Sequence, residues 1–160
     1  HSGRFVVLLE PLEEDAIGWA VVTGVVVVHV DVTNEKHWFA DVKDDDPSQL
    51  KTRGCGSAEI LWKEDGEGEG KWAVVRLGAT PDTIVWGTLK EDLLPDETAE
   101  IDELSTDGPT DRVLEVLAKS LPANTKLPEG STVWAGWNRA SRCYMLIQSL
   151  ECPEETDPDA

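Results

Sequence analysis

The sequence predicts an all-β protein made of two small antiparallel modules, each of barrel or sandwich type. Valine, isoleucine, threonine and tryptophan are concentrated in short runs, which is the composition that β-strands favour. Glycine, proline, asparagine and aspartate interrupt these runs at close intervals, as turns between strands require. With 160 residues, the chain can hold one domain or two small ones.

The strands of the first module follow the apolar runs in chain order. We expect them at residues 4–9, 19–22, 25–32, 38–42, 57–63 and 71–77. The longest apolar run, Val25 to Val28, predicts a strand that is buried on both faces. Residues 44–47 are rich in aspartate and end in proline, so we expect a turn there. The glycines of residues 64–70 suit a loose hairpin loop.

The second module shows the same alternation of apolar runs and turns. We expect strands at residues 83–89, 98–104, 132–137 and 143–149. Residues 112–117 are ambiguous, because Val113, Val116 and Leu117 have helical spacing and Asp111 could cap a helix. The acidic residues 153–160 are expected to form a linker or a loose end.

Two of the predicted hairpins share an aromatic spacing. Trp62 and Trp72 are ten residues apart, Trp134 and Tyr144 are also ten apart, and the second pair follows the first by 72 residues. An internal duplication of one β-module is one interpretation of this spacing. We therefore place the two modules at residues 1–80 and 81–152, followed by an acidic tail at residues 153–160.

The net charge argues against several classes of partner. The chain has 32 acidic and 14 basic residues, for a formal net charge of −18. A nucleic-acid-binding protein needs a basic face to displace counterions from phosphates, and an anionic membrane surface makes a similar demand. No apolar run approaches the roughly 20 residues that span a bilayer. We therefore expect no nucleic acid as a partner and no membrane insertion.

The candidates for a cofactor or a metal site are weak. The three cysteines lack the Cys-x-x-Cys pairing of a zinc or redox site, and the sequence leaves open one disulfide or three free thiols. Asp41, Asp44 and Asp46 could hold a divalent cation loosely, although they lack the ordered spacing of a calcium loop. His29 and His37 could join acidic residues in a metal site. Solvated loops and polar strand edges explain these residues more simply, so we expect no cofactor.

No pattern in the sequence points to an enzyme. The chain has no Gly-x-Ser-x-Gly elbow, and residues 54–57 are too few for a phosphate loop and lack its lysine. Carboxylates are plentiful, but no pair can be placed on either side of a sugar as a glycosidase requires. Cys55 fits an ordinary turn thiol better than a nucleophile. We therefore expect a protein without an active site.

Seven tryptophans against one tyrosine and two phenylalanines is an unusual balance. Their spread over the strands favours the filling of two small cores over a single ligand platform. Trp134 and Trp137 fall on opposite faces of a regular strand, so one of the two is expected to point outward. Outward tryptophans anchor protein partners or stack on sugars. The candidate contacts for a partner or a glycan are Trp134, Trp137 and Trp38.

The chain resembles a known family of β-modules in segments spread over nearly its whole length. The segments are residues 7–11 (VLLEP), 17–26 (IGWAVVTGVV), 37–42 (HWFADV), 56–64 (GSAEILWKE), 71–78 (KWAVVRLG) and 121–152. They resemble the uncharacterised modules repeated near the ends of proteins from planctomycete-like bacteria and their tailed phages. The resemblance implies a strand at residues 112–117, a structural role in a virion or at a surface, and no catalytic residues.

These observations predict a structural subunit of a virion or a surface, such as a capsid-associated, tail, fibre or filament component. It is expected to self-assemble through exposed strand edges and outward apolar residues. Its partners are expected to be other copies of itself or other virion or surface proteins, and its location the virion, the extracellular space or the cell surface. The alternative is a carbohydrate-binding module that uses exposed tryptophans and acidic residues.

Overall fold

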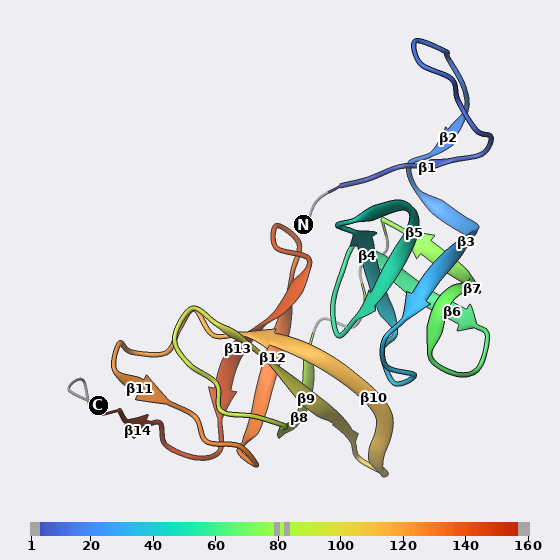
Figure 1. The fold of residues 1–160 in the computed structure, drawn as a ribbon. Helices are drawn as coiled ribbons and strands as arrows, with labels where there is room; N and C mark the ends of the chain where they lie inside the picture. The colour runs from blue at the N-terminus through green and yellow to red at the C-terminus, as the bar shows by residue number, and fades with distance from the viewer. Residues whose placement is uncertain (1–3, 79–80, 82–83, 157–160) are drawn as a thin grey trace. The chain divides into compact units, whose positions relative to one another are not determined.

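The computed structural model describes residues 4–78, 81 and 84–156, and these contain strands and turns but no helix. The chain divides into two compact units, residues 1–79 and 80–160, and each unit is built around a closed β-barrel (Figure 1). The all-β prediction is therefore confirmed. The division between the units falls one residue before the module boundary that the sequence suggested.

Five strands close the first barrel in the order β3-β5-β4-β6-β7. β3 and β5 run parallel, and the other neighbouring pairs, including β3 with β7, are antiparallel. The strands are β3 (Gly24–Val32), β4 (Phe39–Lys43), β5 (Asp46–Arg53), β6 (Ala58–Lys63) and β7 (Gly68–Leu77). The β6–β7 hairpin lies where the sequence predicted it.

Alternating side chains of β3 fill the core of the first barrel. Val28, Val30 and Val32 point inward and belong to the buried apolar cluster. Val25 and Val27 point outward and are more than half exposed. The prediction of a strand buried on both faces was therefore wrong, because the interior of a small barrel receives only one face of each strand.

β5 is the barrel strand that the sequence did not predict. It begins at Asp46, inside the segment expected to be a turn, because Lys43 of β4 already pairs with Asp46 across a two-residue connection. Leu50 and Thr52 are its only buried residues, and the others are partly or fully exposed. No apolar run marks such a strand, and its place follows from pairing with β3 on one side and β4 on the other.

The second barrel closes in the order β10-β13-β12-β8-β9, with β10 and β13 parallel. Residues 112–117 lie within β10, which confirms the strand and excludes the helix that their spacing also allowed. The strands are β8 (Ile84–Leu89), β9 (Thr98–Ser105), β10 (Gly108–Leu117), β12 (Thr132–Asn138) and β13 (Cys143–Ser149).

Each unit also has a short two-stranded sheet. In the first unit, β1 (Val7–Leu8) pairs with β2 (Ala20–Val21). In the second, β11 (Thr125–Lys126) pairs with β14 (Glu154–Glu155). The beginning of the acidic tail is therefore anchored to the second unit, whereas the sequence suggested a linker or loose end. Residues 157–160 of that tail lie outside the described residues.

The two barrels have the same ring of strand pairings, but the chain enters the ring at different places. In the second unit the ring reads first, second, third, fifth and fourth strand in chain order, which is the strand order of an OB-type Greek-key barrel. The first unit has the same ring of pairings when its strands are matched to those of the second. In this match β6 and β7 correspond to β8 and β9, β3 corresponds to β10, β4 to β12 and β5 to β13. The first barrel is thus a circular permutation of the second.

The permutation bears on the duplication that the sequence suggested. The shift of 72 residues aligns the β6–β7 hairpin with β12–β13, but by strand pairing β6–β7 corresponds to β8–β9. The side chains agree with the pairing, since Trp72 is exposed on the outer face whereas Tyr144 is buried. The common aromatic spacing therefore does not mark equivalent positions in the two barrels.

Candidate interaction surfaces

The hairpin of β1 and β2 projects from the first barrel (Figure 1). Its base is fixed, because Phe5, Val7 and Val21 pack against the barrel core. Further out, the backbone N–H of Leu9 donates to the carbonyl oxygen of Trp19 at 3.0 Å, which extends the pairing beyond the two strands. We call residues 6–22, from the base of this hairpin to its tip and back, the arm.

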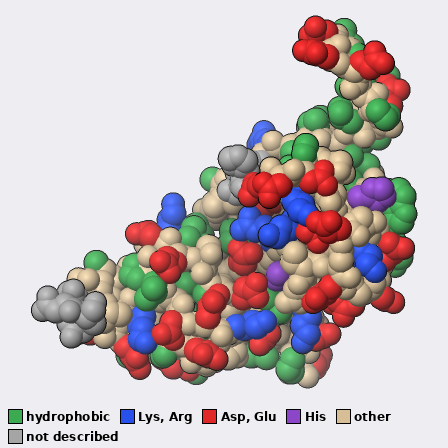
Figure 2. Space-filling view, viewed as in Figure 1, with side chains coloured by type: hydrophobic (Ala, Val, Ile, Leu, Met, Phe, Trp, Pro, Cys, Tyr) green, Lys and Arg blue, Asp and Glu red, His purple; other side chains and the backbone are tan. Residues whose placement is uncertain are grey.

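The arm ends in a tight and acidic turn. The N–H of Ala16 donates to the carbonyl oxygen of Glu13 at 3.1 Å, and Asp15 adopts a positive φ of 63°. Leu12 folds back over Gly18, where an added Cβ would lie 2.3 Å from its Cδ2 atom. The turn therefore has a defined shape without a core of its own, and Figure 2 shows acidic side chains gathered at its tip.

Large apolar side chains of the arm are left in water. Ile17 is fully exposed, Trp19 is 78% exposed, and Leu9 and Val22 are more than half exposed. Leu9 lies opposite Trp19 in the extension of the β1–β2 pairing, so these two side chains share one face of the hairpin. A soluble protein leaves such residues clustered in water chiefly where another molecule covers them.

A second exposed apolar surface lies on the outside of the first barrel. The ring centroids of His29 and Trp72 are 3.9 Å apart across β3 and β7, and Val27 pairs with Val74, which in turn pairs with Trp62 of β6. Figure 2 shows a histidine beside hydrophobic side chains over the outer side of β3. We call this surface the β3 patch, and its members are Val25, Val27, His29, Trp62, Trp72 and Val74.

The second barrel carries a stacked pair of tryptophans on its outer side. Trp86 of β8 pairs directly with Trp134 of β12, and their rings are nearly parallel, with centroids 6.0 Å apart and an interplanar angle of 9°. Both rings are partly exposed. Trp137, three residues later, meets the buried Tyr144 edge-on at 5.0 Å. Of the two candidates on this strand, Trp134 is therefore the one that stacks on the outer side.

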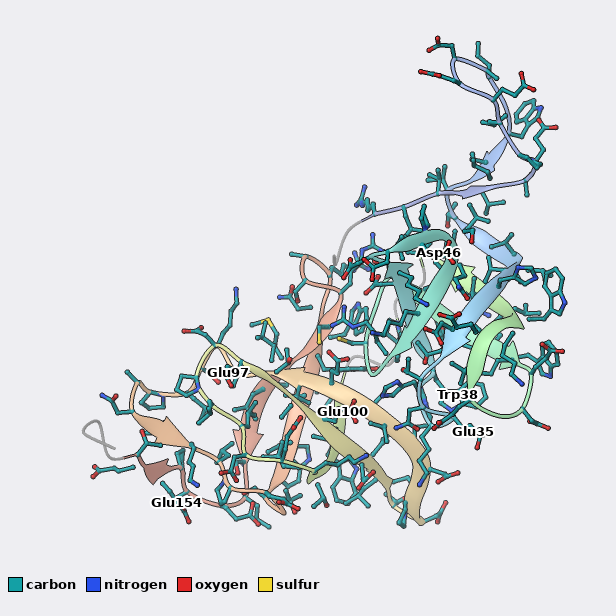
Figure 3. All side chains as sticks on the ribbon, viewed as in Figure 1. Glu35, Trp38, Asp46, Glu97, Glu100 and Glu154 are labelled. Atoms are coloured by element: carbon teal, nitrogen blue, oxygen red, sulfur yellow. The ribbon has the colours of Figure 1, made fainter. Side chains whose placement is uncertain are left out.

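Trp38 contributes to the rim of the first core. It packs against the buried apolar cluster, and the ammonium of Lys63 lies 3.4 Å from the centre of its ring. Figure 3 places it near Glu35 at one end of the barrel, with Asp46 at the other end. The position of Trp38 is explained by packing and by the lysine, so it offers less free surface than the arm or the β3 patch.

The seven tryptophans do not fill the two cores, contrary to the expectation from their spacing. Trp19, Trp62 and Trp72 are exposed, and the other four are partly exposed. Valine, leucine, isoleucine and alanine fill most of the interiors instead, and Phe39 and Tyr144 are buried aromatic residues among them. The reason is size, since the interior of a five-stranded barrel is narrow and the indole ring is the largest side chain.

The structure separates the carboxylates proposed as a loose cation site. Asp41, Asp44 and Asp46 do not lie within ligand distance of one another as a group. Asp41 is buried, where it accepts from the Ser57 N–H at 2.9 Å and from Arg53 at 3.2 Å, and burial raises the pKa of its carboxyl. Asp46 accepts from Ser48 and Gln49, and these hydrogen bonds lower its pKa.

The histidines His29 and His37 and the free thiol of Cys152 occupy ordinary positions. His29 stacks on Trp72 in the β3 patch, whereas His37 is buried and its carbonyl oxygen accepts from Lys63 at 3.0 Å. Cys152 is exposed and has a free thiol. The local geometry of these residues is explained by packing and hydrogen bonding, so the exposed apolar surfaces remain the strongest functional candidates.

Comparison of the chain with protein-family models, with curated proteins and with solved structures gave no match. Among the described residues, no helix is long and apolar enough to cross a membrane. The features of this protein that bear on its function are therefore the surfaces of the two barrels and the arm.

The arm and the β3 patch were not identified from the sequence as candidate sites. The signal was present for the patch, since Val25, Val27 and His29 alternate along one strand. The apolar run that contains them predicts a strand buried on both faces, and only closure of the barrel shows which face is outside. The arm had no such signal, because its residues read as two ordinary strands.

Proposed function

We propose that this protein is a structural subunit of a virion or of a cell or extracellular surface, and that it acts by associating with other copies of itself rather than by catalysis. The observation that carries the proposal is the arm. It projects from the barrel, holds a defined shape, and keeps Ile17, Trp19 and other large apolar side chains in water. Such a feature is explained if a protein partner covers it.

The strand pairing supports the same proposal. A two-stranded hairpin is marginally stable alone in water and gains stability when further strands or side chains cover it. Closure removes free edges from both barrels, so among the described strands the open edges belong to β1, β2, β11 and β14. Assembly through strand edges, as the sequence suggested, would therefore involve these short sheets rather than the barrels.

The charge explains how free subunits stay apart. A net charge of −18 makes copies repel one another at low ionic strength. Salt screens charges that lie more than about 8–10 Å apart at physiological concentrations, but it does not weaken apolar contacts. Self-association is therefore expected to strengthen as salt is added.

The test is sedimentation velocity of the full chain from about 10 mM to 0.5 M salt, a range over which the Debye length falls from about 30 Å to less than 8 Å. We expect the mass of the main species to rise with salt, and electron microscopy to show a uniform oligomer. The double variant Ile17→Asp/Trp19→Asp should stay monomeric, while Ile147→Asp on the second barrel, also at an exposed residue, should behave as wild type. A wild-type protein that remains monomeric at every salt concentration contradicts the proposal.

The stacked pair Trp86–Trp134 favours a second candidate, a carbohydrate-binding module. Aromatic rings on a barrel surface can stack on the apolar faces of sugars, and Trp134 was one of the residues suggested for such a contact. A glycan array tests this directly. Specific binding by a monomer that is lost in Trp134→Ala and kept in Trp62→Ala would favour the binding module over the structural subunit.

A further inference from the structure

Two exposed apolar surfaces of the first unit are neighbours in the chain. The arm returns to the barrel through Val22 and bends at Gly24, where φ is +107°. The β3 patch begins at the next residue, Val25, and continues to His29. A projecting apolar element therefore adjoins an apolar surface that lies flat on the barrel.

The exposed area is large enough for a stable interface. Leu8, Leu9, Ile17, Trp19, Val22, Val25, Val27, Trp62 and Trp72 are each about half exposed or more. Together they leave on the order of 1,000 Å² of side-chain surface in water, divided between the arm and the β3 patch. A stable interface buries about 800 Å² on each partner.

We propose that the β3 patch is covered by the arm of a second copy of this chain, and that two copies exchange arms around a two-fold axis near Gly24. The proposal rests on the proposed function, because it assumes that the protein associates with itself. Each arm lies along the outer side of the other copy's β3, so both apolar surfaces are covered in one closed dimer.

The lengths of the two surfaces match. Ile17 is five positions from Val22 on the arm, and His29 is four positions from Val25 on the patch. At about 3.3 Å for each residue of a strand, the arm reaches roughly 17 Å and the patch roughly 13 Å. Since the arm and the patch extend from the same bend, a two-fold axis at Gly24 places Ile17 of each arm near His29 of the other copy, with the acidic tip beyond it.

The charges favour this antiparallel arrangement. The tip of the arm carries Glu13, Glu14 and Asp15, so a parallel arrangement would bring two acidic tips together. The antiparallel arrangement places each tip at the far end of the other copy's patch. Near the patch, Arg76 lies 3.8 Å from Glu59 and offsets its charge, and the carboxylate of Glu64 is held by the backbone N–H of Trp72 at 2.7 Å.

Sedimentation equilibrium at 0.5 M salt tests which surface is covered. We expect wild type to be a dimer, and we expect Val27→Glu and Trp72→Glu each to weaken dimerisation at least tenfold. Ile17→Asp, at a fully exposed residue that cannot disturb the core, should do the same. Ile147→Glu on the second barrel should leave the dimer unchanged, and circular dichroism of each variant establishes that the barrels are folded.

Cross-linking with a short bismaleimide tests the geometry. In a Cys152→Ser background, which removes the exposed free thiol, the variants Ile17→Cys and His29→Cys are purified separately. We expect a cross-linked dimer when the two are mixed and little product from either alone, whereas Val25→Cys near the axis should cross-link with itself. Efficient cross-linking of Ile17→Cys with itself would overturn the antiparallel exchange.

The outcomes separate this inference from the proposed function. If wild type self-associates but the variants Val27→Glu, Trp72→Glu and Ile17→Asp assemble as wild type does, the arm exchange is wrong and the structural role stands. If assembly continues without limit to long polymers and never stops at a dimer, the closed exchange is also wrong. If wild type is monomeric under all conditions, both proposals fail.

Discussion

The ammonium of Lys63 lies 3.4 Å above the centre of the Trp38 ring and donates to the carbonyl oxygen of His37 at 3.0 Å. Lys63 ends β6 and Trp38 precedes β4, and these two strands are neighbours in the ring. An aromatic face and a carbonyl group thereby both contact a buried cation. These contacts of Lys63 attach the loop that contains His37 and Trp38 to the barrel.

Replacing Lys63 with methionine keeps most of the side-chain volume but removes the charge and the hydrogen bond. We expect the free energy of unfolding to fall by about 1–3 kcal/mol, because a cation–π contact and a buried carbonyl partner are lost together. Urea unfolding followed by circular dichroism measures the change. The control is Lys51→Met on β5, where the lysine is exposed, and its effect should stay within about 0.5 kcal/mol. Equal effects of the two substitutions would contradict this interpretation of Lys63.

Gly87 marks a close approach of two strands in the second barrel. A Cβ at this position would lie 2.4 Å from the carbonyl oxygen of Asp102 on β9, and backbone cannot move aside as a side chain can. We expect Gly87→Ala to destabilise the second barrel by about 1–3 kcal/mol or more. In Gly18→Ala the added Cβ meets the end of the flexible Leu12 side chain, so the loss should be much smaller. Thermal unfolding of the two variants measures both losses of stability. If Gly87→Ala were as stable as wild type, β8 and β9 would be able to move apart at this position.

The buried carboxyl group of Asp41 is expected to make the free energy of unfolding depend on pH. Burial raises the pKa of Asp41 in the folded protein above 3.8, so between these two values the folded state holds the proton more tightly than the unfolded state. The contribution of Asp41 to the free energy of unfolding therefore falls as pH rises through this range. We expect wild type to lose stability relative to Asp41→Asn as pH increases from below 3.8, measured by urea unfolding at each pH.

Asp46 provides a control of opposite sign. Its hydrogen bonds from Ser48 and Gln49 lower the pKa of the folded state below 3.8, so the unfolded state binds the proton more tightly. Wild type should therefore gain stability relative to Asp46→Asn as pH rises toward and just past 3.8. Two difference curves with the same slope would show that the environment of one of these carboxylates differs from the structure.

The stacking of Trp86 on Trp134 should be measurable as an interaction energy. A double-mutant cycle of Trp86→Ala, Trp134→Ala and the combined variant is expected to give a coupling of about 0.5–1.5 kcal/mol, because the rings are paired across β8 and β12. Unfolding by urea supplies the four free energies. Strict additivity would mean that the two rings contribute independently and that the stack has no stabilising role.

The sequence predicted most strands because each has apolar residues on its inner face. It located the β6–β7 and β12–β13 hairpins, and it left residues 112–117 open until the resemblance to known β-modules favoured a strand. It missed β5, in which Leu50 and Thr52 alone are buried. It also could not anticipate the pairing of β14 with β11, since two-residue strands have no periodicity to detect.

The three residues suggested as sites have different surroundings. Trp134 stacks on Trp86 on the outer side of the barrel, Trp137 contacts the buried Tyr144, and the ring of Trp38 contacts the ammonium of Lys63. Their sequence spacing could not distinguish these environments. A strand alternates between two faces, but the sequence does not say which face is inside. Inward and outward become defined only when the strand takes its place in a closed ring.

The sequence by itself determined the all-β composition, the high negative charge and the chain order of most strands, because these depend on residue type and local period. Tertiary structure decided the rest. Closure of the first ring buried Val28 and Val30 and left Val25 and Val27 in water, and the strand order of this ring is a circular permutation of the order in the second. The physical reason is that exposure of a strand residue depends on distant strands, which local sequence does not specify.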